Sequence, residues 1–119
     1  MRTKLGTAAV LVLIGVLSYT SFAGAKTQAT SVAVTAGKPS ELRFTLSKRI
    51  VPKGLTTFSV VNRGVLIHNF KIAGKKTPIL GSGRRAVLKV TFSRAGKYAY
   101  ICTIAGHAQG GMKGVLTVR

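Results

Sequence analysis

Short runs of alternating apolar and polar residues dominate this sequence and restrict what the chain can fold into. One run places Val32, Val34 and Ala36 between small or polar neighbours. The others cover residues 42–46, 58–60, 66–72, 86–92, 98–102 and 116–118. A period of two puts alternate side chains on opposite faces of an extended chain, as in a half-buried strand. Seven such strands, with no helical period after residue 25, predict an all-β fold.

Turn signals separate these runs and indicate how the strands pack. They are Gly37-Lys38-Pro39, Pro52-Lys53-Gly54, Asn62-Arg63-Gly64, Gly81-Ser82-Gly83 and Ala95-Gly96. Short strands with one apolar face, joined by turns, predict a two-sheet antiparallel β-sandwich. Residues 74–83 form the longest expected loop, with room for an eighth strand. His68 and Cys102 both fall on inward faces, so a sandwich can bring them together at one end.

The N-terminus has the order of a secretory signal. Arg2 and Lys4 precede an apolar run at residues 8–17, and small residues follow at Ala23-Gly24-Ala25. We therefore predict a signal peptide over residues 1–25, cleavage after Ala25, and one exported domain over residues 26–119. Its location is then periplasmic, extracellular or at the cell surface. The alternative is a retained membrane anchor, but the apolar run is shorter than the roughly 20 residues that span a bilayer.

Acidic residues are almost missing, and this excludes several classes of site. Lys and Arg number 19, whereas Glu41 is the only acidic side chain, and the formal net charge is +18. Catalysis by paired carboxylates, carboxylate-bound Mg²⁺ or Ca²⁺ and an Asp-oriented triad are therefore not expected. The single Cys excludes an intrachain disulfide and a zinc site with two or four Cys ligands. The two His exclude a multi-histidine metal cluster.

The candidate chemistry lies in Cys102, His107, Met112 and His68. The first three share one glycine-rich loop between two predicted strands, with four residues between each pair. Two imidazoles, a thiolate and a weak thioether form the donor set of blue copper sites. Zinc would also bind such a set, but it has no redox function and Met is a poor zinc ligand. Taken singly, each residue is more often an ordinary core side chain; the combination favours copper.

These residues lie within longer segments that resemble the cupredoxins, the family of type 1 blue copper proteins that includes plastocyanin, pseudoazurin and azurin. The C-terminal segments are Gly96-Lys97-Tyr98-Ala99-Tyr100-Ile101-Cys102, Gly106-His107, Gly111-Met112-Lys113-Gly114 and Leu116-Thr117-Val118. The segments similar to the family's first-histidine region are Val51-Pro52-Lys53-Gly54, Thr57-Phe58, Val61-Asn62-Arg63-Gly64 and His68-Asn69-Phe70. The likeness runs in order over residues 30–119.

The resemblance implies a Greek-key β-sandwich with one copper ion. It implies that His68 and His107 are imidazole ligands, Cys102 the short thiolate ligand and Met112 the long axial ligand. Asn69 matches the position whose side chain ties the ligand loops together and supports the Cys sulfur. Ala105 is a departure, because these proteins often carry Pro before the Gly-His of this loop, and we expect a less rigid loop.

The expected function is one-electron transfer between redox partners, through the edge of His107. An apolar rim around that edge is expected from Leu66, Ile104, Ala105, Gly106 and Ala108. The excess positive charge suggests docking to an acidic redox protein, of the cytochrome or copper oxidoreductase class. Adhesion to an anionic membrane or cell wall is a second reading of the charge. Nothing in the sequence suggests a dimer, so a monomer is expected.

Three other functions were weighed against electron transfer. A copper carrier or buffer would use the same ligands and hand on the ion. A copper oxidase or nitrite reductase needs a further copper centre, and no His remains after His68 and His107; an enzyme is therefore not expected. Nucleic-acid binding is not expected either, because the eight aromatic residues fall mostly on apolar strand faces.

Overall fold

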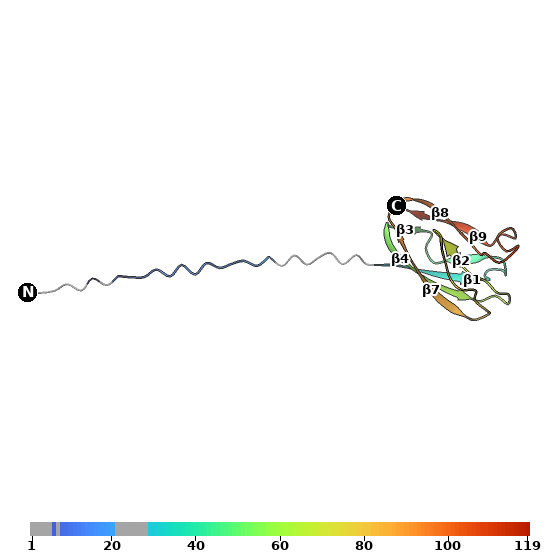
Figure 1. Cartoon of the computed structure of the whole chain (residues 1–119), viewed down its shortest axis with the longest axis horizontal. Coiled ribbons are helices and arrows are strands. Elements are labelled where there is room, and N and C mark those ends of the chain that lie inside the picture. The colour runs from blue at the N-terminus through green and yellow to red at the C-terminus, as the bar shows by residue number, and fades with distance from the viewer. Residues whose placement is uncertain (1–5, 7, 21–28) are drawn as a thin grey trace, which may run out of the picture.

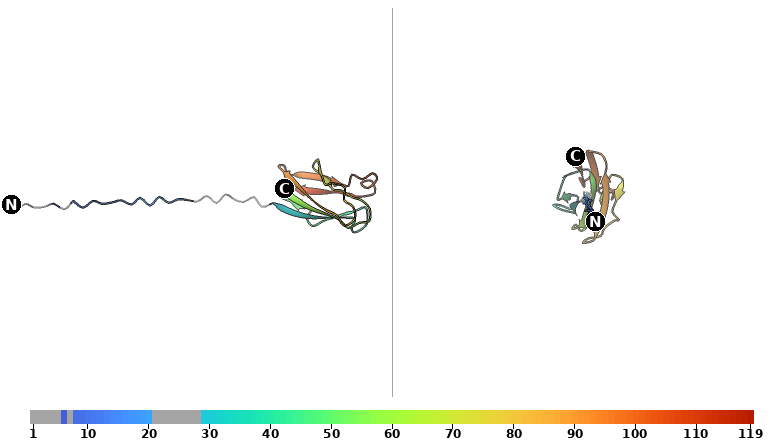
Figure 2. Two further views of the ribbon diagram at one scale, coloured as in Figure 1. Left: turned by 60° about the horizontal axis from the view of Figure 1, so that its bottom comes forward. Right: turned by 90° about the vertical axis from the view of Figure 1, so that its left-hand side faces the viewer.

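The computed structural model describes residues 6, 8–20 and 29–119 (Figure 1). Within residues 29–119 the chain forms nine strands in two facing layers, and it contains no helix there (Figures 1 and 2). Among all described residues, no helix has the length and apolar character needed to cross a bilayer. Residues 8–20 form neither helix nor strand, and their side chains are exposed. The predicted cleavage point after Ala25 lies outside the described residues.

Two sheets share the nine strands. The four-stranded sheet has the order β2-β1-β4-β7, and the five-stranded sheet has the order β3-β9-β8-β5-β6. Their bounds are β1 Thr30–Ala36, β2 Phe44–Leu46, β3 Ile50–Val51, β4 Gly54–Asn62, β5 Lys71–Ile72, β6 Lys75–Lys76, β7 Arg85–Phe92, β8 Gly96–Ile101 and β9 Lys113–Val118. The predicted all-β, two-sheet sandwich is confirmed.

The core fills the space between the sheets with the inward side chains of each alternating run. Phe58 from β4, Phe70 just before β5 and Phe92 from β7 are almost completely buried. The Phe58 and Phe70 rings lie 5.3 Å apart between centroids, and the Phe44 ring meets Phe70 edge-on at 5.4 Å. Burial of this apolar area stabilises the sandwich and holds the strand ends in place.

The expectation of purely antiparallel pairing was wrong, because both sheets are mixed. β1 pairs with β4 in parallel, from Thr30 opposite Thr56 to Ala36 opposite Asn62. β3 pairs with β9 in parallel as well. The cause is the connection after β1: β2 stays in the first sheet, β3 joins the second, and β4 then returns beside β1 in the same direction. A period-two pattern reports which face of a strand is buried and carries no information about strand direction.

The run predicted over residues 66–72 is only partly a strand. Just Lys71–Ile72 forms β5, while His68 makes an isolated bridge with Leu80. Leu66, expected in the rim around the His107 edge, is 49% exposed. Its backbone N–H donates to Glu41 rather than to a neighbouring strand, at 2.8 Å. Two further strands, β3 and β6, were not among the seven; β6 lies in the segment where an eighth strand was considered.

Candidate metal centre

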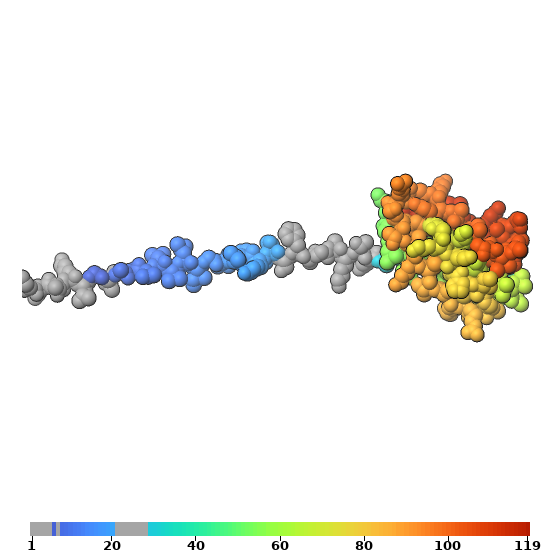
Figure 3. All heavy atoms as spheres, viewed as in Figure 1, coloured from blue at the N-terminus to red at the C-terminus, as the bar shows by residue number. Residues whose placement is uncertain are grey.

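The candidate ligands come together at one end of the sandwich. Cys102 directly follows β8, His107 and Met112 lie in the loop before β9, and His68 lies between β4 and β5. Figure 3 shows the orange-red 103–112 segment beside the lime-green segment after β4, at the end away from the start of β1. The antiparallel pairing of β8 with β9 closes the loop, since the Cys102 N–H donates to the Met112 carbonyl at 3.0 Å.

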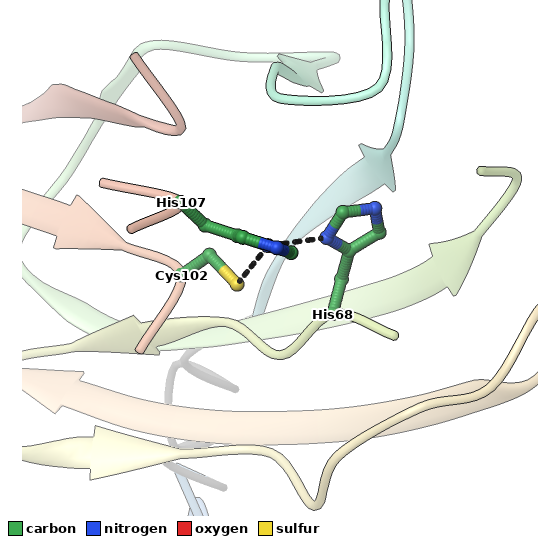
Figure 4. A group of neighbouring side chains, drawn as sticks. All are labelled: His68, Cys102 and His107. Carbon is green, nitrogen blue, oxygen red and sulfur yellow. Dashed lines mark hydrogen bonds between the residues drawn. The ribbon is translucent and has the colours of Figure 1, made fainter. Parts of the chain in front are cut away.

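Three donor atoms converge at this end. One ligand atom each from His68, Cys102 and His107 lie within 4.8 Å of one another. The His107 Nδ1 atom is 3.2 Å from His68 Nδ1 and 3.6 Å from Cys102 Sγ. The three side chains point toward a common centre in Figure 4, with His107 between the other two. The sequence prediction that these residues meet is therefore supported by their geometry.

The spacing of the donors fits a single transition-metal ion. Metal–nitrogen bonds of about 2.0–2.1 Å and metal–sulfur bonds of about 2.3 Å separate the donors of a trigonal site by about 3.5–3.8 Å. The 3.2 Å and 3.6 Å separations are close to that range. His68 and Cys102 are buried, and His107 is half-buried. The site is thus shielded from solvent on the His68 side, and His107 is the ligand residue that reaches the surface.

Met112, the predicted fourth donor, lies at the end of the same loop, directly before β9. Its side chain is completely buried, and its backbone N–H donates to the His107 carbonyl at 2.9 Å. Successive turns shape the loop before it, with His107 N–H donating to the Ile104 carbonyl and Gly110 N–H to the Gly106 carbonyl, both at 3.0 Å. Gly106 has φ +82°, a conformation that side chains other than glycine rarely adopt. The turns bring His107 back toward Cys102.

Asn69 joins the two ligand-bearing segments. Its Nδ2 donates to Thr103 Oγ1 at 2.6 Å, and its Oδ1 accepts from the Thr103 N–H at 2.8 Å. Both bonds reach the residue next to Cys102, and Asn69 itself follows His68. The side chain therefore fixes the distance between the His68 and Cys102 backbones. Thr103, the partner in both bonds, was not identified from the sequence.

Glu41 contacts a candidate ligand directly, and sequence reasoning missed this role. Its Oε1 accepts from His68 Nε2 and from the Leu66 N–H, each at 2.8 Å, and its Oε2 accepts from the Val65 N–H at 3.0 Å. These donors, the two backbone N–H groups first and His68 after them, lower the pKa of Glu41 to about 2. The available signal was that Glu41 is the only acidic side chain in so basic a chain.

The residues after Glu41 hold the other ligand loop. Arg43 Nη1 donates to the Gly110 carbonyl at 2.8 Å and to the Leu42 carbonyl at 2.9 Å. A Cβ atom at Gly110 would overlap Leu42 Cδ1, so the two chains touch closely there. Residues 41–43, which we call the 41–43 strap, thus contact both the His68 loop and the 102–112 loop.

The residues of the predicted apolar rim are all at least partly exposed. Ala105 and Gly106 are exposed, and Ile104 and Ala108 are half-buried. Leu66 is 49% exposed, and its chain neighbours Val65 and Ile67 are exposed as well. Burial, followed by the electrostatic interaction with His68, lowers the pKa of His107, while Glu41 opposes the shift. A lowered pKa leaves the imidazole neutral and able to donate its lone pair to a metal.

Comparison with known proteins decides the family. The model of the copper-binding proteins of the plastocyanin/azurin family matches residues 30–119. The chain belongs to this family. Copper is accordingly the metal that the set of His68, Cys102, His107 and Met112 takes, and the set is typical of a type 1 copper site. No curated protein sequence gives a match.

Solved structures of similar shape are also cupredoxins. Auracyanin from the photosynthetic bacterium Roseiflexus castenholzii has 22% identity and a TM-score of 0.67, over 76% of this chain and 98% of that chain. Auracyanin A, a "blue" copper protein from Chloroflexus aurantiacus, has 21% identity and a TM-score of 0.63, over 77% and 100%. Rusticyanin from Thiobacillus ferrooxidans has 22% identity and a TM-score of 0.61, over 75% and 76%. At these identities the likeness establishes the cupredoxin fold.

Proposed function

We propose that this cupredoxin is an exported carrier of single electrons between redox partners. The observation that supports the proposal is the convergence of two imidazoles and a thiolate within 4.8 Å at one end of the sandwich. Copper bound by this set would supply one-electron redox chemistry, and the fixed donors would need little rearrangement.

Each of the four residues has a distinct part in this proposal. Cys102, at 1% exposure, supplies the thiolate from the end of β8, where the pairing of β8 with β9 fixes its backbone. His68 and His107 supply neutral imidazole nitrogens from two different segments. Met112, buried at the end of the loop, would supply a weak thioether donor. The packed sandwich keeps these positions in both oxidation states, which favours rapid electron exchange.

His107 is the proposed exit for the electron. It is the only one of the three converging residues that is not fully buried. The proposed rim of Leu66, Ile104, Ala105, Gly106 and Ala108 consists of apolar residues that are at least partly exposed, and it would allow a partner to approach closely without ordered water between them. A partner with an acidic surface around an apolar centre fits this arrangement, because every Lys and Arg within residues 29–119 is exposed.

Spectroscopy and exchange kinetics test this function together. The copper-loaded chain is expected to show the intense thiolate-to-copper absorption, and Cys102→Ser is expected to abolish it. Electron self-exchange is expected to be fast and copper transfer to a chelator slow. Slow electron exchange with fast loss of copper would instead identify a copper carrier or buffer. Colour retained in Cys102→Ser would contradict the ligand assignment.

Export is the remaining part of the proposal. It is supported by the charged, apolar and small-residue order of residues 1–25, the proposed signal peptide. The measurement is the mass of the mature protein after expression with its own N-terminus in a bacterial host. A chain that begins at Lys26 in the exported fraction is expected. An uncleaved chain in the membrane fraction would favour a retained anchor.

A further inference from the structure

Glu41 is placed to control how His68 presents itself to the metal. A carboxylate only accepts hydrogen bonds, so the 2.8 Å contact requires the proton of the imidazole to lie on Nε2. Nδ1 is then the nitrogen with the lone pair, and it faces His107 and Cys102. The alternative tautomer would put a proton on the nitrogen that must bind copper.

The carboxylate is itself held rigidly. Its two oxygens accept from the N–H groups of Val65 and Leu66, at 3.0 Å and 2.8 Å, as well as from His68. The residue before them makes room for it: a Cβ atom at Gly64 would overlap Glu41 Oε1 and lie 3.0 Å from His68 Nε2. Gly64 does not have a positive φ, so close packing of the carboxylate is what requires glycine here.

We propose that Glu41 is a positioning residue that selects the Nε2–H tautomer of His68, orients its ring toward copper and lowers the reduction potential of the site. The proposal rests on the copper-carrier function above and adds a carboxylate–histidine–metal arrangement to it. A negative charge on the far nitrogen makes Nδ1 a stronger donor. A stronger donor stabilises the more highly charged cupric form over the cuprous form.

The competing explanation is that Glu41 only stabilises the loop at residues 64–66. Ser82 offers a matched control, because its Oγ donates to the Gly64 carbonyl at 2.6 Å and supports the same loop. It is not among the hydrogen-bond partners of His68. Ser82→Ala therefore removes loop support and leaves the carboxylate–imidazole contact in place.

The first test uses the metal-free full chain. Ring-nitrogen chemical shifts of His68 are expected to show the Nε2–H tautomer alone in the wild type and a mixture of tautomers in Glu41→Ala. Ser82→Ala is expected to keep the wild-type shifts. A mixture of tautomers in the wild type would overturn the proposal, and this readout does not depend on whether the chain carries electrons.

The second test uses the copper-loaded chain. Copper affinity is expected to fall about 10–100-fold in Glu41→Ala, the usual effect of losing a residue that orients a metal ligand. The reduction potential is expected to rise in Glu41→Gln, which keeps the size of the side chain and removes its charge, and in Gly64→Ala, which displaces the carboxylate. An unchanged potential in Glu41→Gln, or an equal change in Ser82→Ala, would refute the role of Glu41. Slow electron exchange with these effects intact would refute the carrier function alone.

Discussion

At the scale of single residues, the two predicted sulfur donors differ in how firmly they are held and in how strongly they would bind copper. Cys102 lies at the end of a strand, and its backbone is fixed by the bond to Met112, so its thiolate has one position. Met112 is buried at the opposite end of the loop, and a thioether carries no charge and binds copper weakly. Loss of the first should destroy the site, whereas loss of the second should only tune it.

Met112→Leu is expected to keep the thiolate-to-copper absorption and raise the reduction potential. The substitution conserves volume, so the free energy of unfolding should fall by less than about 1.5 kcal/mol. The potential rises because one donor to the cupric form is lost and the site becomes more apolar. Voltammetry and absorption spectra of the variant check this. Complete loss of copper binding would show that Met112 is more than a weak axial ligand.

Glu41 makes the metal-free protein sensitive to acid in a defined direction. Its pKa is lowered from 4.5 to about 2 on folding, so its contribution to stability is fully present above pH 4.5. That contribution is lost as the pH falls from about 4.5 through about 2. The difference in free energy of unfolding between wild type and Glu41→Gln should therefore shrink over this range. Denaturant titrations at several pH values measure it, and a difference that is constant with pH would contradict the assignment.

At the scale of elements, the site is built from two loops, and side-chain hydrogen bonds hold these loops together. The His68 loop, residues 63–70, connects β4 of the four-stranded sheet to β5 of the five-stranded sheet. The 102–112 loop connects β8 to β9 within the five-stranded sheet. Asn69 ties them through Thr103, and the 41–43 strap contacts each of them from before β2. The donors are thus held near their final positions by the protein itself.

Asn69→Ala is expected to loosen this connection. It removes two hydrogen bonds to Thr103, each worth about 0.5–1.5 kcal/mol, and should lower the free energy of unfolding by about 1–3 kcal/mol. It should also broaden the spin-resonance signal of the loaded protein, because the spacing of His68 and Cys102 becomes variable. Ser47→Ala is the control, since it removes one bond to the Ala33 N–H away from the ligand loops. A signal broadened equally by both variants would argue against the role of Asn69.

The strands were predictable from the sequence to the extent that they are long and half-buried. β1, β4, β7, β8 and β9 alternate over six to nine residues, and each was predicted. β3 and β6 have two residues each, too few for a period to appear. The loss of strand structure at residues 66–70 could not be predicted, because the Leu66 N–H donates to Glu41, 25 residues earlier, and not to a neighbouring strand. The three converging donors were predictable because the chain has only one Cys and two His.

At the scale of the whole molecule, positive charge is spread over the surface with little to balance it. The formal net charge is +18, and Glu41 is the only acidic side chain. Lys71 and Lys76 even lie directly opposite each other in the pairing of β5 with β6, an arrangement that destabilises a strand pair. The folded state therefore carries a repulsive electrostatic energy that depends on ionic strength.

The free energy of unfolding is expected to rise with salt. Between about 0.01 M and 0.15 M ionic strength the screening length falls from about 30 Å to about 8 Å, which weakens repulsion between distant Lys and Arg side chains. Thermal unfolding in sodium chloride measures the effect, and the same series in a neutral osmolyte separates it from general exclusion effects. A stability that falls as salt is added would show that repulsion is not dominant.

The encounter rate with an acidic partner should respond to salt in the opposite sense. Attraction between the basic surface and an acidic protein is screened, so the second-order rate of electron transfer should fall as ionic strength rises. Stopped-flow measurements with an acidic cytochrome and with a small uncharged reductant test this. The rate with the uncharged reductant should stay nearly constant. A flat or rising rate with the acidic protein would rule out electrostatic steering.

The direction of β1 has a consequence for how the molecule would sit beside a surface. The strand starts at Thr30, and its other end, Ala36, lies next to Arg63, whose N–H donates to the Ala36 carbonyl near the His68 loop. Seven extended residues span about 20 Å. A tether attached ahead of Thr30 would therefore hold the protein at the end opposite the copper site (Figure 1). The copper site would then face away from the anchoring surface and stay accessible to soluble partners.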